Sequence, residues 1–263
     1  MTDGSSISAL ARKPIDRLEQ LDVDTYFSRY HDKRPFVFGN YAAKWRCFEH
    51  WNIEYFRKRV GSRTVLLWSN ERGVYNFRDS PESGAVQKLT VPFSLALDRI
   101  ANPDAGRRYY IKQPLIMEFP ELLEDLVLPH FIPQKHDLRT LNLWMGADHT
   151  VSSLHYDLPQ NFLVLLRGTK QFLMCSPADS PLLYQNSGEK FPQMSRCNLE
   201  NYDERLFPDV RRVEFGSAEL SAGDMIYIPS RWWHHVTSWG FNIALSFSWE
   251  QRAGLGMQPA MTK

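Results

Sequence analysis

The 263-residue sequence lacks an excess of either charge, because its 31 basic side chains are balanced by 30 acidic ones. A protein that binds nucleic acid through a broad basic surface carries a clear positive excess, so composition gives no sign of that class. No apolar run approaches the ~18 residues of a membrane span. The N-terminal residues also lack the apolar stretch of a secretory signal. We therefore expect an intracellular, soluble protein, located in the cytoplasm or the nucleus.

Cysteine is scarce, and its spacing matches no metal-binding motif. The three cysteines, Cys47, Cys175 and Cys197, are an odd number and lie far apart. We expect free thiols in a reducing compartment rather than a disulfide framework. Internal repeats and low-complexity segments are also absent from the sequence. Hydrophobic residues make up 43% of the chain, which is enough for a sizeable core and excludes a disordered or collagenous protein.

The second half of the sequence contains many short, apolar, β-branched runs separated by turns. Such runs predict a mainly β fold, a sandwich or barrel of antiparallel strands such as a jelly roll. Helical patterns concentrate in the first half and are expected to flank the barrel. We expect a flexible N-terminus over residues 1–13 and a single domain over residues 14–263. Its parts would be a helical and strand segment (14–139), a barrel core (140–249) and a short tail (250–263).

Two local patterns in the barrel region carry specific predictions. Residues 161–166 and 170–175 are apolar runs, and Arg167-Gly168-Thr169 between them predicts a tight hairpin. Residues 234–239 and 242–249 are predicted to form the last two strands. Residues 176–208, which follow the first pattern, are rich in proline, serine and asparagine, and we expect them to be irregular.

Two stretches near the barrel ends carry the chemistry. In a strand, residues i and i+2 share a face, so His155 and Asp157 would present an imidazole and a carboxylate on the same side. A histidine from the distant pair His234 and His235 would complete a set of two histidines and one carboxylate, which is diagnostic for non-haem Fe(II) oxygenases. Strand alternation lets only one histidine of that pair face inward. The competing interpretation is a chance His-x-Asp triplet beside an aromatic core or surface patch.

Lys170 is the second informative residue, because it begins an otherwise apolar run. An ammonium group is costly to bury without an anion, so Lys170 is a candidate partner for a carboxylate of a small dianion. Tyr110 and Ser152 would add hydroxyl donors to that carboxylate, and Asn161 would add an amide near the metal. The competing interpretation places Lys170 at the solvated end of the turn at Gly168 and gives the other three residues structural roles.

The order of these motifs resembles a known family. LHYDLPQNFLVLLRGTKQFLMCSP, LSAGDMIYIPSRWWHHV and NIALSFSW are similar to a JmjC domain of the small, hydroxylase-like cupin group. This group includes the asparaginyl hydroxylase of hypoxia-inducible factor. RPFVFGN and WNIEYFRKRVG extend the resemblance over nearly the whole chain. The resemblance implies a double-stranded β-helix of the jelly-roll or cupin type with flanking N-terminal helices.

The resemblance also implies Fe(II) as the metal, with 2-oxoglutarate and O2 as co-substrates. The metal ligands would be His155, Asp157 and His234. The 2-oxoglutarate site would comprise Lys170, Tyr110, Ser152, Asn161 and Ser246. The last of these departs from the family pattern, because some relatives carry asparagine there. No metal or lysine position is lost, which argues against an inactive enzyme.

The implied activity is that of a dioxygenase that hydroxylates a C–H bond and releases succinate and CO2. A protein side chain is the expected substrate. Three alternatives stay open: a JmjC-type lysine demethylase, a hydroxylase of a tRNA base or small metabolite, and a non-catalytic cupin-type binding module. The sequence shows no zinc or reader module beside the domain, which disfavours the demethylase, and its balanced charge disfavours RNA. The sequence does not indicate an oligomeric state.

Overall fold

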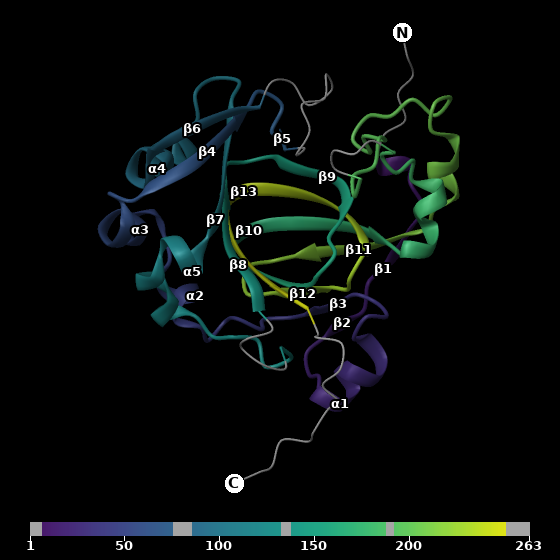
Figure 1. Cartoon of the computed structure of the whole chain (residues 1–263), viewed down its shortest axis with the longest axis horizontal. Helices are drawn as coiled ribbons and strands as arrows, with labels where there is room; N and C mark the ends of the chain where they lie inside the picture. The colour runs from purple at the N-terminus through teal and green to yellow at the C-terminus, as the bar shows by residue number, and fades with distance from the viewer. Residues whose placement is uncertain (1–6, 76–85, 133–137, 188–191, 251–263) are drawn as a thin grey trace.

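The computed structural model describes residues 7–75, 86–132, 138–187 and 192–250. β-strands form a barrel at its centre, and most of the N-terminal helices cover one side of that barrel (Figure 1). Within these residues, no helix is long and apolar enough to cross a membrane. Cys47, Cys175 and Cys197 are buried free thiols, as expected.

Two long antiparallel strands organise the barrel, β10 (Gln160–Cys175) and β13 (Trp233–Trp249). They pair with each other from end to end, and each runs through both sheets of the barrel. Shorter strands continue the sheet on either side of this pair. The partners of β13 are β8 (Leu138–Gly146) and β9 (Thr150–Tyr156), and those of β10 are β11 (Phe215–Leu220) and β12 (Met225–Ile228). This arrangement is a double-stranded β-helix and confirms the predicted mainly β, jelly-roll fold.

The predicted hairpin at residues 167–169 is wrong, because β10 continues through it. The pairing register with β13 shifts on both sides of Arg167, which is the signature of a bulge. Gly168 has a φ of 82°, and a Cβ there would lie 2.5 Å from the side chain of Asn242. Only glycine fits this bend, which lets one strand pass between the two sheets. Likewise, the two predicted last strands are one strand, β13.

Further strands extend the sheet beyond β8. In spatial order they are β7 (Arg108–Pro114), β4 (Thr64–Asn70) and β6 (Gln87–Pro92). Beyond β12, the sheet ends with β3 (Phe36–Phe38) and β2 (Arg17–Leu18).

Two short parallel strands complete the sheet. β5 (Val74–Tyr75) pairs with β9, and β1 (Arg12–Pro14) pairs with β11. The pairing of β1 includes Arg12 and Lys13, so the fold begins before the boundary expected at residue 13. Residues 1–6 of the expected flexible N-terminus and 251–263 of the expected tail lie outside the described residues.

The helices are short and pack on the outer strands. They are α1 (Val23–Thr25), which continues as a π-helix to Tyr30, α2 (Arg46–His50), α3 (Ile53–Val60), α4 (Phe93–Ala101) and α5 (Leu115–Glu118). The side chain of Asn52 caps α3 by accepting a hydrogen bond from the Tyr55 amide at 2.9 Å. Phe93, Ala96, Leu97 and Ile100 of α4 recur at helical spacing and are buried. Each large apolar side chain buried in this way contributes about 1.5–3 kcal/mol.

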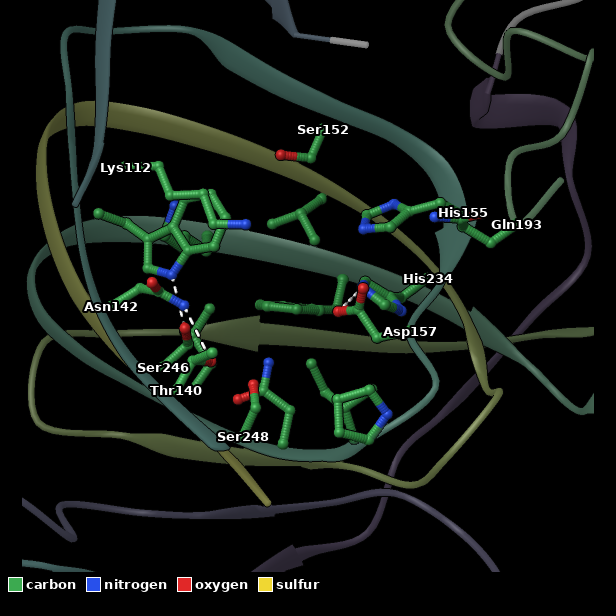
Figure 2. Close-up of a pocket in the computed structure, with 18 of the residues that line it drawn as sticks. Lys112, Thr140, Asn142, Ser152, His155, Asp157, Gln193, His234, Ser246 and Ser248 are labelled. Atoms are coloured by element: carbon green, nitrogen blue, oxygen red, sulfur yellow. Dashed lines mark hydrogen bonds and ion pairs between the residues drawn. The ribbon is translucent and has the colours of Figure 1, made fainter. Parts of the chain in front are cut away.

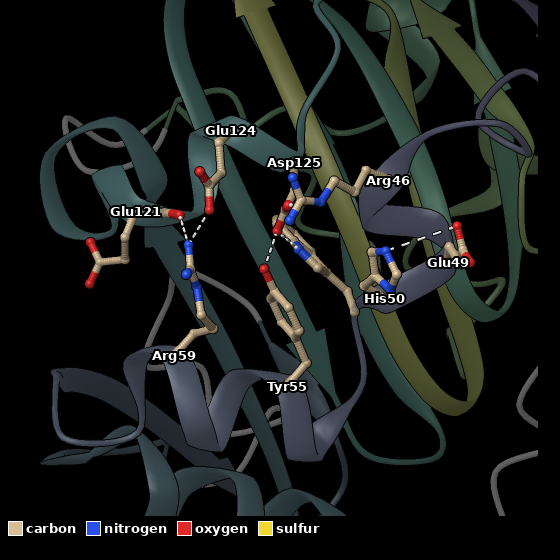
Figure 3. Close-up of polar contacts among 9 residues, drawn as sticks. Arg46, Glu49, His50, Tyr55, Arg59, Glu121, Glu124 and Asp125 are labelled. Atoms are coloured by element: carbon tan, nitrogen blue, oxygen red, sulfur yellow. Dashed lines mark hydrogen bonds and ion pairs between the residues drawn. The ribbon is translucent and has the colours of Figure 1, made fainter.

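A buried carboxylate ties the helices to a 3-10 segment, Pro120–Asp125 (Figure 3). Asp125 is 1% exposed and accepts hydrogen bonds from Trp51 Nε1 at 2.9 Å and from the Tyr55 hydroxyl. The Nε of Arg46 lies 3.0 Å from its second oxygen and forms an ion pair with it. This carboxylate therefore has a partner on each oxygen.

Candidate metal centre and adjoining cavity

Strand alternation separates an apolar core from a polar cavity. On β8, Leu141, Leu143 and Met145 belong to the core that faces the helices. The residues between them point to the other face and line a cavity of about 380 Å³ inside the barrel. From β8 and β13, that lining includes Thr140, Asn142, Trp144, Ser246 and Ser248. The same strands thus supply both the core and the wall of the site.

Three ligand-type side chains meet at one end of this cavity (Figure 2). His155 on β9 lies directly opposite His234 on β13, and Asp157 follows the end of β9. One donor atom from each residue lies within 4.8 Å of the other two. Nε2 of His234 is 3.9 Å from Oδ2 of Asp157, and the two imidazole centroids are 4.2 Å apart. The structure therefore brings together the three residues expected to form a facial set.

Backbone carbonyls orient both imidazoles. Nδ1 of His155 lies 2.6 Å from the carbonyl oxygen of Ser153, and Nδ1 of His234 lies 3.0 Å from that of Trp232. A carbonyl oxygen can only accept, so Nδ1 donates in each ring and Nε2 carries the lone pair. Such hydrogen bonds orient metal-binding histidines in many proteins. Burial and the neighbouring His155 lower the pKa of His234 to about 4, so this ring is neutral at pH 7, the form that binds metals.

His235 has a different environment and does not line the cavity. Its Nε2 lies 2.7 Å from Oε1 of Glu200, which also accepts a hydrogen bond from Thr237 at 3.2 Å. Glu200 belongs to the long segment between β10 and β11. Of the two adjacent histidines, only His234 therefore faces the cluster.

Lys170 lies in the cavity wall and is 2% exposed. Its Nζ donates a hydrogen bond to the hydroxyl of Ser238 at 2.6 Å. Burial lowers the pKa of Lys170 to about 7, and no described carboxylate opposes this shift. The interpretation of Lys170 as the solvated end of a turn is therefore wrong. An anion bound in the cavity would stabilise its charged form.

The other four predicted residues also line this cavity. Tyr110 on β7 stacks against Tyr75 with ring centroids 5.1 Å apart, and burial raises its pKa. The hydroxyl of Ser246 accepts a hydrogen bond from Trp144 Nε1 at 2.7 Å. The side-chain oxygen of Asn161 is buried and has no hydrogen-bond partner among the described residues. Ser152 lies on β9 and contributes a hydroxyl to the wall.

Lys112 and Gln193 are two of the lining residues that were not predicted from the sequence. Lys112 follows Tyr110 by two positions on β7, so strand alternation would have placed it on the same face. Gln193 comes from the irregular segment, where its carbonyl accepts a hydrogen bond from the Tyr156 amide at 3.0 Å. Nothing in the sequence indicates that this segment adds to the edge of β9.

The double-stranded β-helix and its His-x-Asp and histidine cluster define a cupin of the JmjC type. The chain belongs to the family described as "Cupin-like domain", whose model matches residues 25–254. This match covers most of the chain and agrees with the resemblance seen in the sequence motifs.

Three relatives illustrate the similarity. The zebrafish "Lysine-specific demethylase 8" is 30% identical over 245 residues, which cover 90% of this chain and 58% of the relative. The Arabidopsis "Lysine-specific demethylase JMJ30" is 29% identical over 251 residues, with coverages of 93% and 57%. The chicken "tRNA wybutosine-synthesizing protein 5" is 25% identical over 221 residues, with coverages of 78% and 67%. The chain thus spans somewhat more than half the length of the two demethylase-named proteins.

Proposed function

We propose that the protein is an Fe(II)- and 2-oxoglutarate-dependent dioxygenase that hydroxylates a C–H bond of a protein side chain. The reaction would consume the substrate, O2 and 2-oxoglutarate and give the hydroxylated product, succinate and CO2. One observation carries the proposal: a buried lysine without a described carboxylate partner shares a cavity with two histidines and an aspartate.

The donor set fits Fe(II). His155 and His234 would bind through Nε2 and Asp157 through its carboxylate, which is the set typical of non-haem iron oxygenases. The backbone hydrogen bonds to both Nδ1 atoms support this assignment, because they fix each ring before any metal arrives. These residues face the cavity, which leaves room for a co-substrate on that side.

The remaining predicted residues fit 2-oxoglutarate. Lys170 would hold the far carboxylate, with Tyr110 and Ser152 as hydroxyl donors, and Asn161 and Ser246 would lie closer to the metal. Iron and 2-oxoglutarate, when bound, supply the oxidising power that inserts one oxygen atom into the substrate C–H bond. The protein holds the carboxylate, orients the substrate and excludes bulk water from a cavity whose Lys170 wall is almost fully buried.

Paired surface charges argue against RNA as the substrate. Helix α3 and the turn after it carry several arginines, the most basic cluster of the N-terminal half. Each of the following pairs lies within ion-pair distance: Arg57 with Asp98, Arg59 with Glu124, and Arg63 with Glu121. Cations that are neutralised by neighbours contribute little to phosphate binding.

The names of the relatives support two of the alternatives, a lysine demethylase and an enzyme that modifies tRNA. Two relatives are named lysine-specific demethylases and one is named for tRNA modification. A lysine demethylase would use the same metal and co-substrate sites, so the substrate decides between the possibilities.

A succinate-release assay tests the proposal. The protein would be incubated with Fe(II), 2-oxoglutarate and O2, together with either a peptide pool or a tRNA pool, and products would be identified by mass spectrometry. We expect succinate release stimulated by peptides and a gain of one oxygen on a peptide. The matched control is His155→Ala, which should fold but release no succinate. Binding of 2-oxoglutarate without turnover in any pool would instead indicate a non-catalytic module.

A further inference from the structure

Strand β7 separates two cavities in this protein. Tyr110 lines the cavity beside the metal cluster, whereas its neighbour Tyr109 lines a second pocket. Adjacent residues of a strand point to opposite faces of the sheet, so the two cavities lie on opposite sides of β7. The second pocket has a volume of about 300 Å³, and strands β4, β6 and β7 and helix α4 contribute to its wall. It shares no lining residue with the first cavity, and the proposed function assigns it no role.

Strand β6 forms one side of this pocket and ends the sheet, in the part of the chain that the structure describes. Its six residues pair with β4, and no described strand pairs with its other edge. β6 lies with β4 and α4 on the side of the molecule away from β1 and β11 (Figure 1). The outer edge of such a strand presents N–H and C=O groups that can pair with a further strand. β6 can therefore accept one strand supplied by another molecule.

The pocket leaves two leucines open to solvent. Leu89 of β6 is 44% exposed and Leu95 of α4 is 42% exposed, and both line the pocket. Gln87, Leu89 and Val91 alternate along β6 and face this side, so alternate side chains of an added strand would face it too. An apolar side chain at one of these positions would cover both leucines and remove their surface from water. Binding by strand addition takes its specificity from pockets of this kind.

Positive charge predominates around the pocket. Among the described residues that line it, Arg99 and Arg107 are cationic and Asp104 is the only carboxylate. Arg99 forms an ion pair with Asp104. By contrast, Nη1 of Arg107 donates hydrogen bonds to neutral acceptors on β4 and β6, each at 3.1 Å. A carboxylate, that of Glu71, lies 3.9 Å from Nη2 of Arg107 and is largely exposed. The charge of Arg107 is thus only weakly offset, and a ligand carboxylate would complement it.

The same charges disfavour a second copy of this chain as the occupant. Pairing two β6 strands would bring the exposed Lys88 of both copies to one interface, together with the arginines of both pockets. Like charges that meet across an interface oppose association. A partner segment with a carboxylate avoids this repulsion.

We propose that β6 and the pocket beside it bind an extended, acidic segment of a partner protein. The segment would pair along β6 and place an apolar side chain over Leu89 and Leu95. A carboxylate two positions away would lie beside Arg107, because Gln87, which accepts a hydrogen bond from Arg107, is two positions from Leu89 on the same side of β6. This site is separate from the metal cluster, so the inference does not depend on the proposed function.

The first test uses short labelled peptides and the full chain without metal or 2-oxoglutarate. The probes are Thr-Thr-Leu-Thr-Glu-Thr-Thr and the reverse order Thr-Thr-Glu-Thr-Leu-Thr-Thr, since the added strand can run either way. Fluorescence anisotropy would measure the Kd. We expect saturable binding of at least one order. Lysine in place of glutamate should weaken it at least about tenfold, because a charged hydrogen bond is replaced by repulsion.

N-methylation of the peptide tests the strand pairing itself. In an added strand, every second N–H points to the edge it pairs with, and the others point to solvent. Methylating one alternate set of amides should therefore abolish binding, whereas methylating the other set should leave it nearly unchanged. A peptide held only by its side chains would not show this alternation.

Two protein variants with matched controls locate the site. Leu95→Asp should abolish peptide binding, whereas Leu66→Asp should not, because Leu66 is a leucine of similar exposure that does not line the pocket. Arg107→Gln should remove the preference for glutamate over lysine. Arg57→Gln, on α3 and outside the pocket, should keep that preference. Circular dichroism would confirm that each variant folds.

Four outcomes would overturn the proposal. They are no binding of either peptide by the wild type, equal losses in the pocket variants and their controls, the same effect of both sets of N-methyl groups, and a dimer that forms through this face. Analytical ultracentrifugation detects the dimer, and its loss in Leu95→Asp would show that a second copy occupies the site. Because no step requires turnover, failure here leaves the proposed function unaffected, and the succinate-release assay leaves this inference unaffected.

Discussion

Two buried charged side chains in this protein, Asp125 and Lys170, differ in how fully their neighbours compensate the charge. Asp125 between the helices accepts hydrogen bonds on Oδ2 from Trp51 and Tyr55, and its Oδ1 forms an ion pair with Arg46 (Figure 3). Lys170 in the barrel has one hydroxyl partner, Ser238, and no described carboxylate. Both side chains are at most 2% exposed.

The difference is between a charge that neighbouring side chains compensate and one that they compensate only in part. A buried charge costs several kcal/mol unless other groups compensate it. The fold compensates Asp125 from its own side chains, so that carboxylate holds elements together. It leaves Lys170 undercompensated beside a cavity, so the missing stabilisation is available to an anion that binds there. Five experiments test this difference between Asp125 and Lys170.

The largest expected effect is on folding stability at Asp125. Asp125→Ala leaves Trp51 and Tyr55 without their acceptor, and breaking such a buried network costs about 3–5 kcal/mol. The free energy of unfolding would be measured by urea denaturation. Asp98→Ala is the control, because its exposed pair with Arg57 should contribute less than about 1 kcal/mol. Similar losses in both variants would contradict the structural role of Asp125.

Lys170→Met should have the next largest effect, this time on ligand affinity. Removing one partner of a buried charge pair costs about 2–5 kcal/mol, which is roughly 30-fold to several thousand-fold in the Kd for 2-oxoglutarate. Lys170→Arg should rescue binding only in part, because its planar head is longer and shaped differently. The measurement is calorimetry with Mn(II) in place of iron. Unchanged affinity would remove the main support for 2-oxoglutarate.

His234 and His235 differ in a similar way, because His235 pairs with Glu200 whereas His234 lines the cavity. His234→Ala should weaken Fe(II) binding by roughly 100-fold or more, since even the outer partners of metal ligands contribute 10–100-fold. His235→Ala should keep most of the metal affinity, because that side chain pairs with Glu200 outside the cavity. Anaerobic Fe(II) titration of both variants decides the matter. The opposite pattern would mean that the strand register is wrong by one residue.

A smaller effect of opposite sign is expected for Lys170→Met without ligand. Replacing an undercompensated buried cation by an apolar side chain of similar length should raise the free energy of unfolding by about 1 kcal/mol or more. Urea denaturation in the absence of metal and 2-oxoglutarate measures this. A clear loss of stability would show that Lys170 serves the fold, as Asp125 does.

The smallest effect is a proton taken up on binding. The pKa of Lys170 is lowered to about 7 in the folded protein, below its ordinary value of 10.5. The unfolded chain therefore binds more protons between these values, and stability without ligand should rise with pH across that window. At pH 8, binding of 2-oxoglutarate should recharge the amine and take up close to one proton. Calorimetry in buffers of different ionisation enthalpy would detect it, and Lys170→Met should abolish it.

The sequence predicted which side chains gather at the candidate site better than the course of the chain. His155 is on β9 and Asp157 is the first residue after it, and the i, i+2 rule was sufficient to put them on one side. The hairpin at Gly168 failed because a glycine bulge and a tight turn share the same residue pattern. The burial of Lys170 and the approach of Gln193 depend on strands distant in sequence, which no local pattern encodes. Lys112 was predictable from its spacing to Tyr110.

The end-to-end pairing of β10 and β13 has a geometric consequence. His234 and Ser238, the partner of Lys170, lie four positions apart on β13, or ~13 Å along a strand. The distance between the candidate metal ligands and Lys170, the proposed anion partner, is therefore set by the backbone of one strand rather than by side chains. A single residue inserted between His234 and Ser238 would turn one of these two side chains to the outer face of the barrel. A point mutation can remove either side chain, but only a change in chain length can alter the spacing between them.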